Sequence, residues 1–327
     1  MIHLFLVILL IILAFGYFKI AEYFKIHDKP NERSSHHKAT LLGGGVIFYF
    51  ALLLYSFFFD FQYPWLLVGA TVLAAVSFID DLHPLSPRFR LVIHFVSLFI
   101  LFVDLDLYTL SVPVLIVLFI VGVGLMNAYN FMDGINGMMG FTSMVVLLGM
   151  IYVNSYVIVF IDINLLYSLL LGVVIFNFFN FRTNAFCFAG DVGAFTIGLI
   201  MVFLIYKLIA VSGNFAWIAL LAVFGVDTIL TIIHRICLGE NITRPHRKHL
   251  FQILANELKI PQLFISAGYG LVQVLVIIGL VVFREYSLIF AVAAIFVLSV
   301  FYILIKQKYY YLHCNSHSCF RTKKTDK

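Results

Sequence analysis

Polar and acidic residues interrupt this apolar chain in short segments that lie between long hydrophobic runs. The central segment separates the apolar runs Ser111–Met126 and Met138–Val153 and reads Asn127-Ala-Tyr-Asn130-Phe-Met-Asp133-Gly-Ile-Asn136-Gly137. A carboxylate this close to a bilayer is costly and rarely idle. We therefore expect this segment to have a function beyond turning the chain.

The polar segments together supply an acidic set and a basic set. The acidic residues are Asp80, Asp81, Asp133 and Asp191, and the basic residues are Arg90, Arg182, Arg247 and His249. Carboxylates that hold Mg²⁺ and cations that bind phosphate oxygens are the parts of a phosphoryl-transfer site. Mg²⁺, with Mn²⁺ as an alternative, suits these hard oxygen ligands better than zinc does, because no Cys/His quartet accompanies them.

Two local patterns support a phosphate site. Asp80 and Asp81 are adjacent at the end of an apolar run, and neighbouring carboxylates are best tolerated beside a divalent cation or basic groups. Asp191 lies between glycines at the start of a predicted helix, where helix N–H groups and a metal-binding carboxylate together favour a phosphate. Phe188, just before it, could stack on a base.

A further carboxylate, Asp227, lies about two helical turns inside the ninth apolar run. An unpaired charge there costs several kcal/mol. Asp227 is either paired with a basic group or lines a polar cleft, and the sequence leaves both alternatives open.

The composition predicts an all-α polytopic membrane protein. Of the 327 residues, 63% are hydrophobic and 11% are charged, and soluble domains do not have such values. At roughly 20 apolar residues per helical span, the sequence predicts about eleven transmembrane helices. The apolar runs are Ile2–Phe18, Gly44–Phe59, Trp65–Ile79, Leu91–Val103, Ser111–Met126, Met138–Val153, Leu165–Phe179, Ala194–Val211, Phe215–Ile233, Leu263–Phe283 and Leu288–Ile305.

Positive charges indicate the orientation of these helices. The first run has no Lys or Arg before it and no cleavage site after it, so we expect a retained span with its N-terminus outside. Of the 21 Lys and Arg residues, all except Lys207 and Arg284 then fall inside, as the positive-inside rule requires. The C-terminus is predicted to be cytoplasmic.

We predict one transmembrane catalytic domain, residues 1–306, and a polar cytoplasmic tail, residues 307–327. The cytoplasmic loops are residues 19–43, 80–90, 127–137, 180–193 and 234–262. The sequence shows neither a Walker motif nor a soluble nucleotide-binding module, and no aromatic-basic repeat indicates nucleic acid. The expected phosphorylated acceptor is therefore a lipid that is approached from within the bilayer.

Three motifs are jointly specific for one family: Asp80-Asp81 followed by Leu85-x-Pro87 and Arg90, Asn127-x-x-Asn130-x-x-Asp133-Gly-Ile-x-Gly137, and Phe188-x-Gly190-Asp191-x-Gly193. They resemble the polyprenyl-phosphate N-acetylhexosamine-1-phosphate transferases of glycosyltransferase family 4. The resemblance extends from Asp28 to Leu250. It implies a Mg²⁺-dependent enzyme of the bacterial inner membrane, with eleven helices and an active site that faces the cytoplasm.

The resemblance also implies the reaction and its partners. An N-acetylhexosamine-1-phosphate, expected to be GlcNAc-1-phosphate, passes from the UDP-sugar to undecaprenyl phosphate and releases UMP. The product starts a cell-envelope polysaccharide such as O-antigen. Membrane lipid is the surrounding partner, no nucleic acid is involved, and a homodimer is left open.

By the same resemblance, Asp80 deprotonates the lipid phosphate, and Asp191 is the principal Mg²⁺ ligand, supported by Asp81 and Asp133. The implied substrate contacts are Asn130 and Asp133 to the nucleotide and metal, Phe188 to the uracil, and Arg247 and His249 to the diphosphate or sugar. Arg90 and Arg182 are the remaining substrate-binding candidates, as cations of the basic set.

Some positions depart from the family pattern. Asn136 stands where many relatives have Asp, Thr183-Asn184-Ala185 replaces a usual Pro-Ala, and Phe251-Gln252 replaces a frequent His-His pair. These departures leave the sugar open.

A transporter is the alternative function, since many spans with Gly-rich interruptions are typical of transporters. The polar groups are predicted at one face instead of the midplane, and no inverted repeat is evident in the sequence, so the transferase is favoured.

Overall fold

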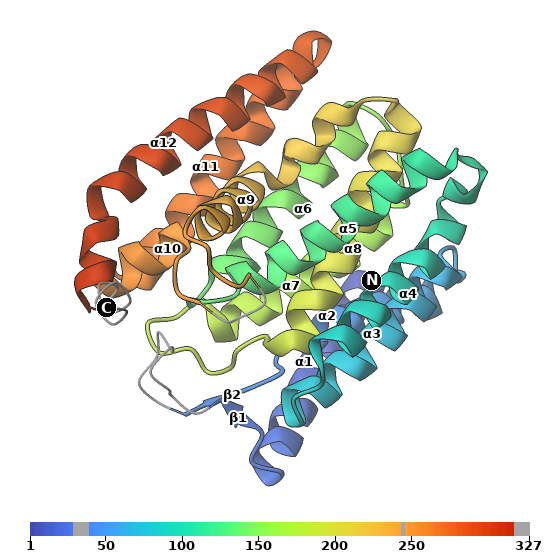
Figure 1. Ribbon diagram of the computed structural model, residues 1–327. Coiled ribbons are helices and arrows are strands. Elements are labelled where there is room, and N and C mark those ends of the chain that lie inside the picture. The colour runs from blue at the N-terminus through green and yellow to red at the C-terminus, as the bar shows by residue number, and fades with distance from the viewer. Residues whose placement is uncertain (29–38, 243–245, 317–327) are drawn as a thin grey trace.

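The computed structural model describes residues 1–28, 39–242 and 246–316. These residues form a bundle of helices (Figure 1). The helices are α1 (Ile2–Tyr23), α2 (Val46–Phe58), α3 (Pro64–Leu82), α4 (Pro87–Asp104), α5 (Val112–Met132), α6 (Met138–Tyr156), α7 (Ile163–Asn180), α8 (Gly190–Ser212), α9 (Ala222–Cys237), α10 (Leu250–Gln252), α11 (Gln262–Val282) and α12 (Ser287–Ser316). The shorter elements are β1 (His27–Asp28), β2 (Thr40–Leu41), η1 (Leu107–Thr109), η2 (Phe215–Leu221), the π-helical η3 (Ile253–Glu257) and η4 (Arg284–Tyr286).

The prediction of an all-α polytopic membrane protein is confirmed. Each of the eleven predicted runs is helical, and nine helices of the described chain are long and apolar enough to cross a bilayer. The ninth run comprises η2 and α9 together, as the span Phe215–Cys237. Of the two remaining runs, α2 has only 13 residues and α4 includes Arg88, Arg90 and Asp104. The number of spans and the position of the N-terminus stay predictions.

The segments predicted to be cytoplasmic meet at one end of the bundle, the lower left of Figure 1. The Phe188 N–H donates to the Leu41 carbonyl at 2.8 Å, which joins the segment before α8 to β2. At the opposite end, the Tyr55 hydroxyl donates to Asp162 at 3.0 Å and Asn214 donates to Ser287 at 2.8 Å. The polar segments thus lie together, as one-sided topology requires.

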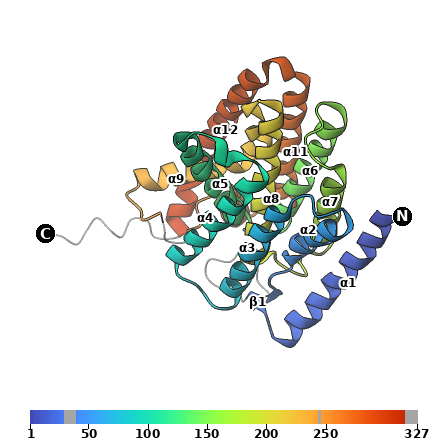
Figure 2. The same ribbon diagram turned by 90° about the vertical axis from the view of Figure 1, so that its right-hand side faces the viewer.

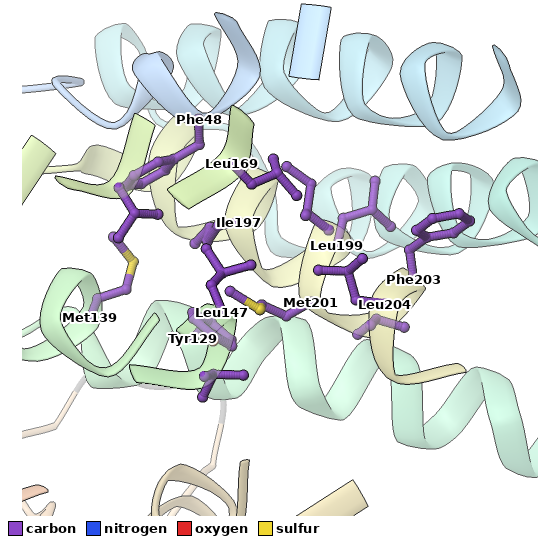
Figure 3. Packing of buried hydrophobic residues seen from close by; sticks show 14 of the residues in the cluster. Phe48, Tyr129, Met139, Leu147, Leu169, Ile197, Leu199, Met201, Phe203 and Leu204 are labelled. Atoms are coloured by element: carbon purple, nitrogen blue, oxygen red, sulfur yellow. The ribbon is translucent and has the colours of Figure 1, made fainter. Parts of the chain in front are cut away.

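The helix α8 is the centre of the bundle. It is apolar on all sides, and 78% of its span is buried, compared with 11% for the span that contains α12. Figure 3 shows its residues Ile197, Met201 and Phe203 packed among side chains of neighbouring helices. The helix α1 lies at one edge of the bundle (Figure 2) and turns apolar side chains outward, as a lipid-facing helix does.

Several boundaries differ from the prediction. The helix α5 continues to Met132, so most of the predicted loop 127–137 is helical. The last helix, α12, runs to Ser316, and the predicted domain end at residue 306 stays a prediction. Parts of two predicted loops, residues 29–38 and 243–245, and the end of the tail, residues 317–327, lie outside the described residues. These helices are longer than their apolar runs because polar residues at the membrane interface can continue the backbone hydrogen bonds of a helix. Hydropathy alone does not detect such turns.

Candidate active site

The start of α8 is held by a carboxylate from α3. The backbone N–H groups of Asp191 and Val192 donate to the two oxygens of Asp81, at 2.8 and 3.1 Å. Gly190 has a φ of +72°, and a Cβ built there would lie 2.6 Å from Asp81 Oδ2. Glycine is therefore required at this position, because it allows both the backbone conformation and the approach of Asp81. The negative charge also stabilises the positive end of the helix.

Asp191 is held between α5 and α4. Its Oδ1 accepts a hydrogen bond from Asn130 Nδ2 at 2.7 Å, and its Oδ2 lies 3.3 Å from Arg90 Nη1. The same guanidinium nitrogen lies 2.9 Å from Oδ2 of Asp80, whose Oδ1 accepts the Leu85 N–H at 2.6 Å. Arg90 thus bridges two carboxylates that would otherwise repel each other.

Asp133 follows the last turn of α5 and completes the acidic group. Burial raises the pKa of Asp133 from 3.8 to about 7, and the negative charge of the neighbouring Asp191 carboxylate contributes to this rise. A carboxylate so poorly compensated by the protein is an environment that a divalent cation would stabilise.

The acidic group fits Mg²⁺ through two carboxylates. The described residues contain no group of three or more His, Cys, Asp and Glu side chains that could hold a metal ion by themselves. Both oxygens of Asp81 already accept N–H groups of α8, whereas the charge of Asp191 acts on the buried Asp133. Mg²⁺ commonly binds one or two carboxylates and takes its other ligands from water and substrate phosphates, so the donor set suits a metal shared with a diphosphate.

The predicted basic residues lie in three different surroundings. Arg90 is part of the acidic group, whereas Arg182 is exposed, donates to the Phe178 carbonyl at 2.6 Å and stacks on the Phe178 ring at 4.5 Å. Arg247 is half-buried in the segment before α10. Of the predicted arginines, Arg90 therefore contacts the carboxylates, whereas Arg182 lies along the side of α7.

His249 reaches the end of α5. The residue is 2% exposed, and its ring centre lies 5.9 Å from that of Phe131, which is adjacent to Asn130 in the chain. The ring of His246 lies 4.9 Å from that of His249. Burial, followed by the positive charge of neighbouring groups, lowers the pKa of His246 to about 3. His246 thus lies beside a predicted site residue; the sequence analysis did not select it, although it lies in the dense basic segment before α10.

Asn136, the departure from the family pattern, joins three segments. Its Nδ2 donates to the carbonyls of Arg182 and Thr183, at 2.8 and 3.2 Å. Its own N–H donates to Gln262 Oε1 at 2.9 Å, at the start of α11. An aspartate could not donate to these carbonyls, so asparagine here is explained by the altered segment that follows α7.

Phe188 is placed by its backbone. Its N–H donates to the Leu41 carbonyl, and its carbonyl accepts the Gly44 N–H, both at 2.8 Å. These bonds tie the segment before α8 to the segment before α2, two residues ahead of the Gly190 turn. The ring is half-buried at the same end of the bundle as the acidic group.

An apolar pocket of about 370 Å³ lies between α9, α10, α11 and α12, beside the His249 segment. Its lining is apolar except for Asp227, Tyr269 and Tyr302. Two lining residues, Phe264 and Phe301, are 74% and 60% exposed, so the pocket lies at the outer surface of the bundle, where lipid would meet it.

Comparison with known proteins identifies the segment that contains the acidic group. Residues 63–209 match the model of glycosyl transferase family 4. All four predicted acidic residues lie within this match, as do Asn130 and Phe188, whereas Arg247 and His249 follow it. The family resemblance inferred from the three motifs is thereby confirmed.

Two curated relatives are similar to the chain at low identity. A Bacillus subtilis protein is 26% identical over 203 residues, which are 57% of this chain and 56% of that protein. Its curated name gives, as a provisional activity, undecaprenyl-phosphate N-acetylglucosaminyl 1-phosphate transferase. A Methanocaldococcus jannaschii protein, named provisionally as a glycosyltransferase, is 28% identical over 160 residues, or 46% of this chain and 51% of that protein. The chain thus matches about half the length of each relative.

Substitutions can distinguish Asp81, which anchors the start of α8, from Asp133, which we expect to bind a ligand. Asp81→Asn places an amide N–H against the N–H groups of α8, so we expect the free energy of unfolding to fall by about 1–3 kcal/mol. Asp133→Asn removes a buried charge beside Asp191, so stability is expected to stay equal or rise. Thermal unfolding in detergent without divalent cations measures both, and equal destabilisation by the two variants would contradict these assignments.

Asn136→Asp tests the explanation of the departure from the family pattern. The carboxylate would face two carbonyl oxygens in a position that is 7% exposed. We expect a loss of about 1–3 kcal/mol in unfolding free energy. The matched control is Asn184→Asp, an exposed position on the same segment, which should change stability little. Equal stability of the two variants would show that the donor bonds of Asn136 are dispensable.

Proposed function

We propose that this protein transfers a sugar-1-phosphate from a nucleotide sugar to a polyprenyl phosphate within the membrane. The observation that supports this most is Asp191 at the start of α8, which is held by Asn130 and Arg90 and acts on the buried Asp133, inside the segment that matches glycosyl transferase family 4. The proposed donor is UDP-N-acetylglucosamine, and the proposed acceptor is undecaprenyl phosphate, in line with the name of the Bacillus subtilis relative.

The proposed reaction exchanges one phosphoanhydride bond for another. An oxygen of the lipid phosphate attacks the phosphorus that bears the sugar. The bond from that phosphorus to the bridging oxygen breaks, and UMP leaves with the bridging oxygen. The product is a lipid diphosphate sugar. Little covalent chemistry is required of the protein, so positioning and charge stabilisation dominate catalysis.

Each member of the acidic group has a distinct proposed role. Asp133 and Asp191 would hold Mg²⁺, which when bound supplies positive charge for the diphosphate oxygens and the departing UMP. Asp80, kept in place by Arg90 and the Leu85 N–H, would take the proton of the acceptor phosphate. Asp81 would act by fixing the start of α8 and hence the direction of Asp191.

The surroundings suit a lipid acceptor and a soluble donor. The acidic group lies at the end of the bundle where the positively charged segments meet, which we propose to be the cytoplasmic side of a bacterial inner membrane. The apolar pocket beside the His249 segment offers the isoprenoid chain an apolar surface at the same end. Phe188, Arg182, Arg247 and His249 are the proposed contacts of the uracil, diphosphate and sugar.

The proposal predicts release of UMP when both substrates are present. Purified protein in detergent with undecaprenyl phosphate, Mg²⁺ and UDP-N-acetylglucosamine should form UMP and a lipid-linked sugar, and removal of divalent cations with EDTA should abolish both. Asp191→Asn should lower the rate about 10²–10³-fold, because a charge that stabilises the transition state is lost. A panel of UDP-N-acetylhexosamines in the same assay identifies the sugar.

The matched control is Asp106→Asn, an exposed aspartate at the opposite end of the bundle, which should retain the full rate. If the wild-type protein released no UMP from any of the UDP-sugars, with Mg²⁺ or with Mn²⁺, the proposed activity would be refuted. Accumulation of a solute by proteoliposomes under those conditions would instead favour a transporter.

A further inference from the structure

Asp227 is a buried carboxylate that the proposed reaction does not use. It lies on α9 within the span Phe215–Cys237 and is 2% exposed. A charge at such a position is retained only when its oxygens are fully hydrogen-bonded.

Four donors surround this carboxylate. Oδ1 accepts hydrogen bonds from the Leu250 N–H at 3.1 Å and from Thr231 Oγ1 at 3.2 Å, and Oδ2 accepts one from the Tyr269 hydroxyl at 2.7 Å. The fourth partner is Nδ1 of His249, which is 3.1 Å from Oδ1. Because a carboxylate can only accept, the proton between them belongs to Nδ1.

The Gln252 N–H has two acceptors on His249: the carbonyl oxygen at 3.1 Å and the side chain, which it reaches as in a capping box. Because the carbonyl can take this N–H whereas a carboxylate can only accept, we assign the proton of Nδ1 to the contact with Asp227. Gln252 Oε1 accepts the His249 N–H at 3.2 Å. Nε2 is buried without a hydrogen-bond partner in the described structure.

A second line of donors brings positive charge to Asp227. Lys306, which is 4% exposed on α12, contacts the Tyr302 hydroxyl, and that hydroxyl lies 2.6 Å from Thr231 Oγ1. Lys306 is the first donor of this chain of hydrogen bonds. The Tyr302 hydroxyl accepts from Lys306 and donates to Thr231, whose hydroxyl donates to Asp227. The buried cation thus balances the buried carboxylate, and His249 can stay neutral.

The imidazole lies between this network and the end of α5. Nδ1 faces α9 through Asp227, and the ring is adjacent to Phe131 and His246. Phe131 stands between Asn130 and Asp133 in the chain. The nitrogen that Asp227 leaves free therefore belongs to a residue packed against the last turn of α5, which contains Asn130 and precedes Asp133.

We propose that Asp227 is a positioning residue, which fixes His249 in the Nδ1–H form and orients its Nε2 toward the donor sugar. In this form Nε2 accepts a hydrogen bond, so its partner is a hydroxyl or amide N–H of the sugar. The proposal rests on the proposed transferase function. It assigns the role that the sequence left open, since Asp227 both pairs with a basic residue and lines the pocket.

Asp227→Asn tests the proposal because it removes the negative charge and preserves the shape. The asparagine oxygen would take the position of Oδ1, which accepts the Leu250 N–H, so His249 would keep a neutral acceptor but lose the charge that holds its proton on Nδ1. We expect kcat/KM for the nucleotide sugar to fall about tenfold or more, while KM for the polyprenyl phosphate stays unchanged. Thr228→Val, at a neighbouring buried position of α9, is the control and should retain the wild-type rate.

A double-mutant cycle separates positioning from general support of the fold. If Asp227 acts through His249, Asp227→Asn should cause no further loss in a His249→Gln background. The proposal would be overturned if the losses of kcat/KM in the two single variants multiplied in the double variant. It would also be overturned if the loss of activity in Asp227→Asn equalled its loss of folded protein.

The ¹⁵N NMR signals of His249 provide a readout that is independent of activity. The wild-type protein should show Nδ1 protonated and Nε2 bare, with the assignment made from the His249→Gln variant. A proton on Nε2 in the wild type would overturn the proposal even where Asp227→Asn does not fold. An inactive wild type with the Nδ1–H form would instead refute the transferase function and leave the Asp227–His249 pairing established.

Discussion

The Asp81 carboxylate accepts the N–H groups of Asp191 and Val192 and so joins the end of α3 to the start of α8. The first N–H groups of a helix have no partner within the helix, and in a membrane protein they cannot be left unpaired. One carboxylate satisfies two of them and fixes where the central helix begins. The direction of Asp191, and through it the contacts with Asn130 and Arg90, depends on this junction.

The other carboxylates are compensated in different ways, and the differences indicate their roles. Arg90 neutralises Asp80, and a network of donors that ends at Lys306 surrounds Asp227. Asp133 has a pKa raised by burial and by Asp191. Asp191 is oriented by Asn130 and Arg90, whereas the charge of Asp133 is opposed by burial and by Asp191, which is an environment that a shared cation would stabilise.

Much of the architecture follows from sequence patterns that have a direct physical cause. Apolar runs predict the helices, and the bias of Lys and Arg predicts that the polar segments share one end, where the structure indeed places Asp81 beside Asp191. The contacts within the site are less accessible, because they join residues far apart in the chain. The bridge from Arg90 to Asp191 and the donors from Asn136 to the segment after α7 depend on helix rotation and helix ends. A hydropathy profile does not report helix rotation or the exact ends of helices. The sequence therefore could not decide whether Asp227 pairs with a basic group or lines a polar cleft.

The central claim is that Asp133 and Asp191 hold a divalent cation together with the diphosphate of a nucleotide sugar. A crystal structure with Mn²⁺ and a non-hydrolysable UDP-N-acetylglucosamine analogue tests this most directly, because the anomalous signal of Mn²⁺ locates the ion without reference to the refined coordinates. The account predicts an anomalous peak within bonding distance of Asp133 and Asp191 and of the diphosphate oxygens. A peak at other residues, or a nucleotide bound at the opposite end of the bundle, would contradict it.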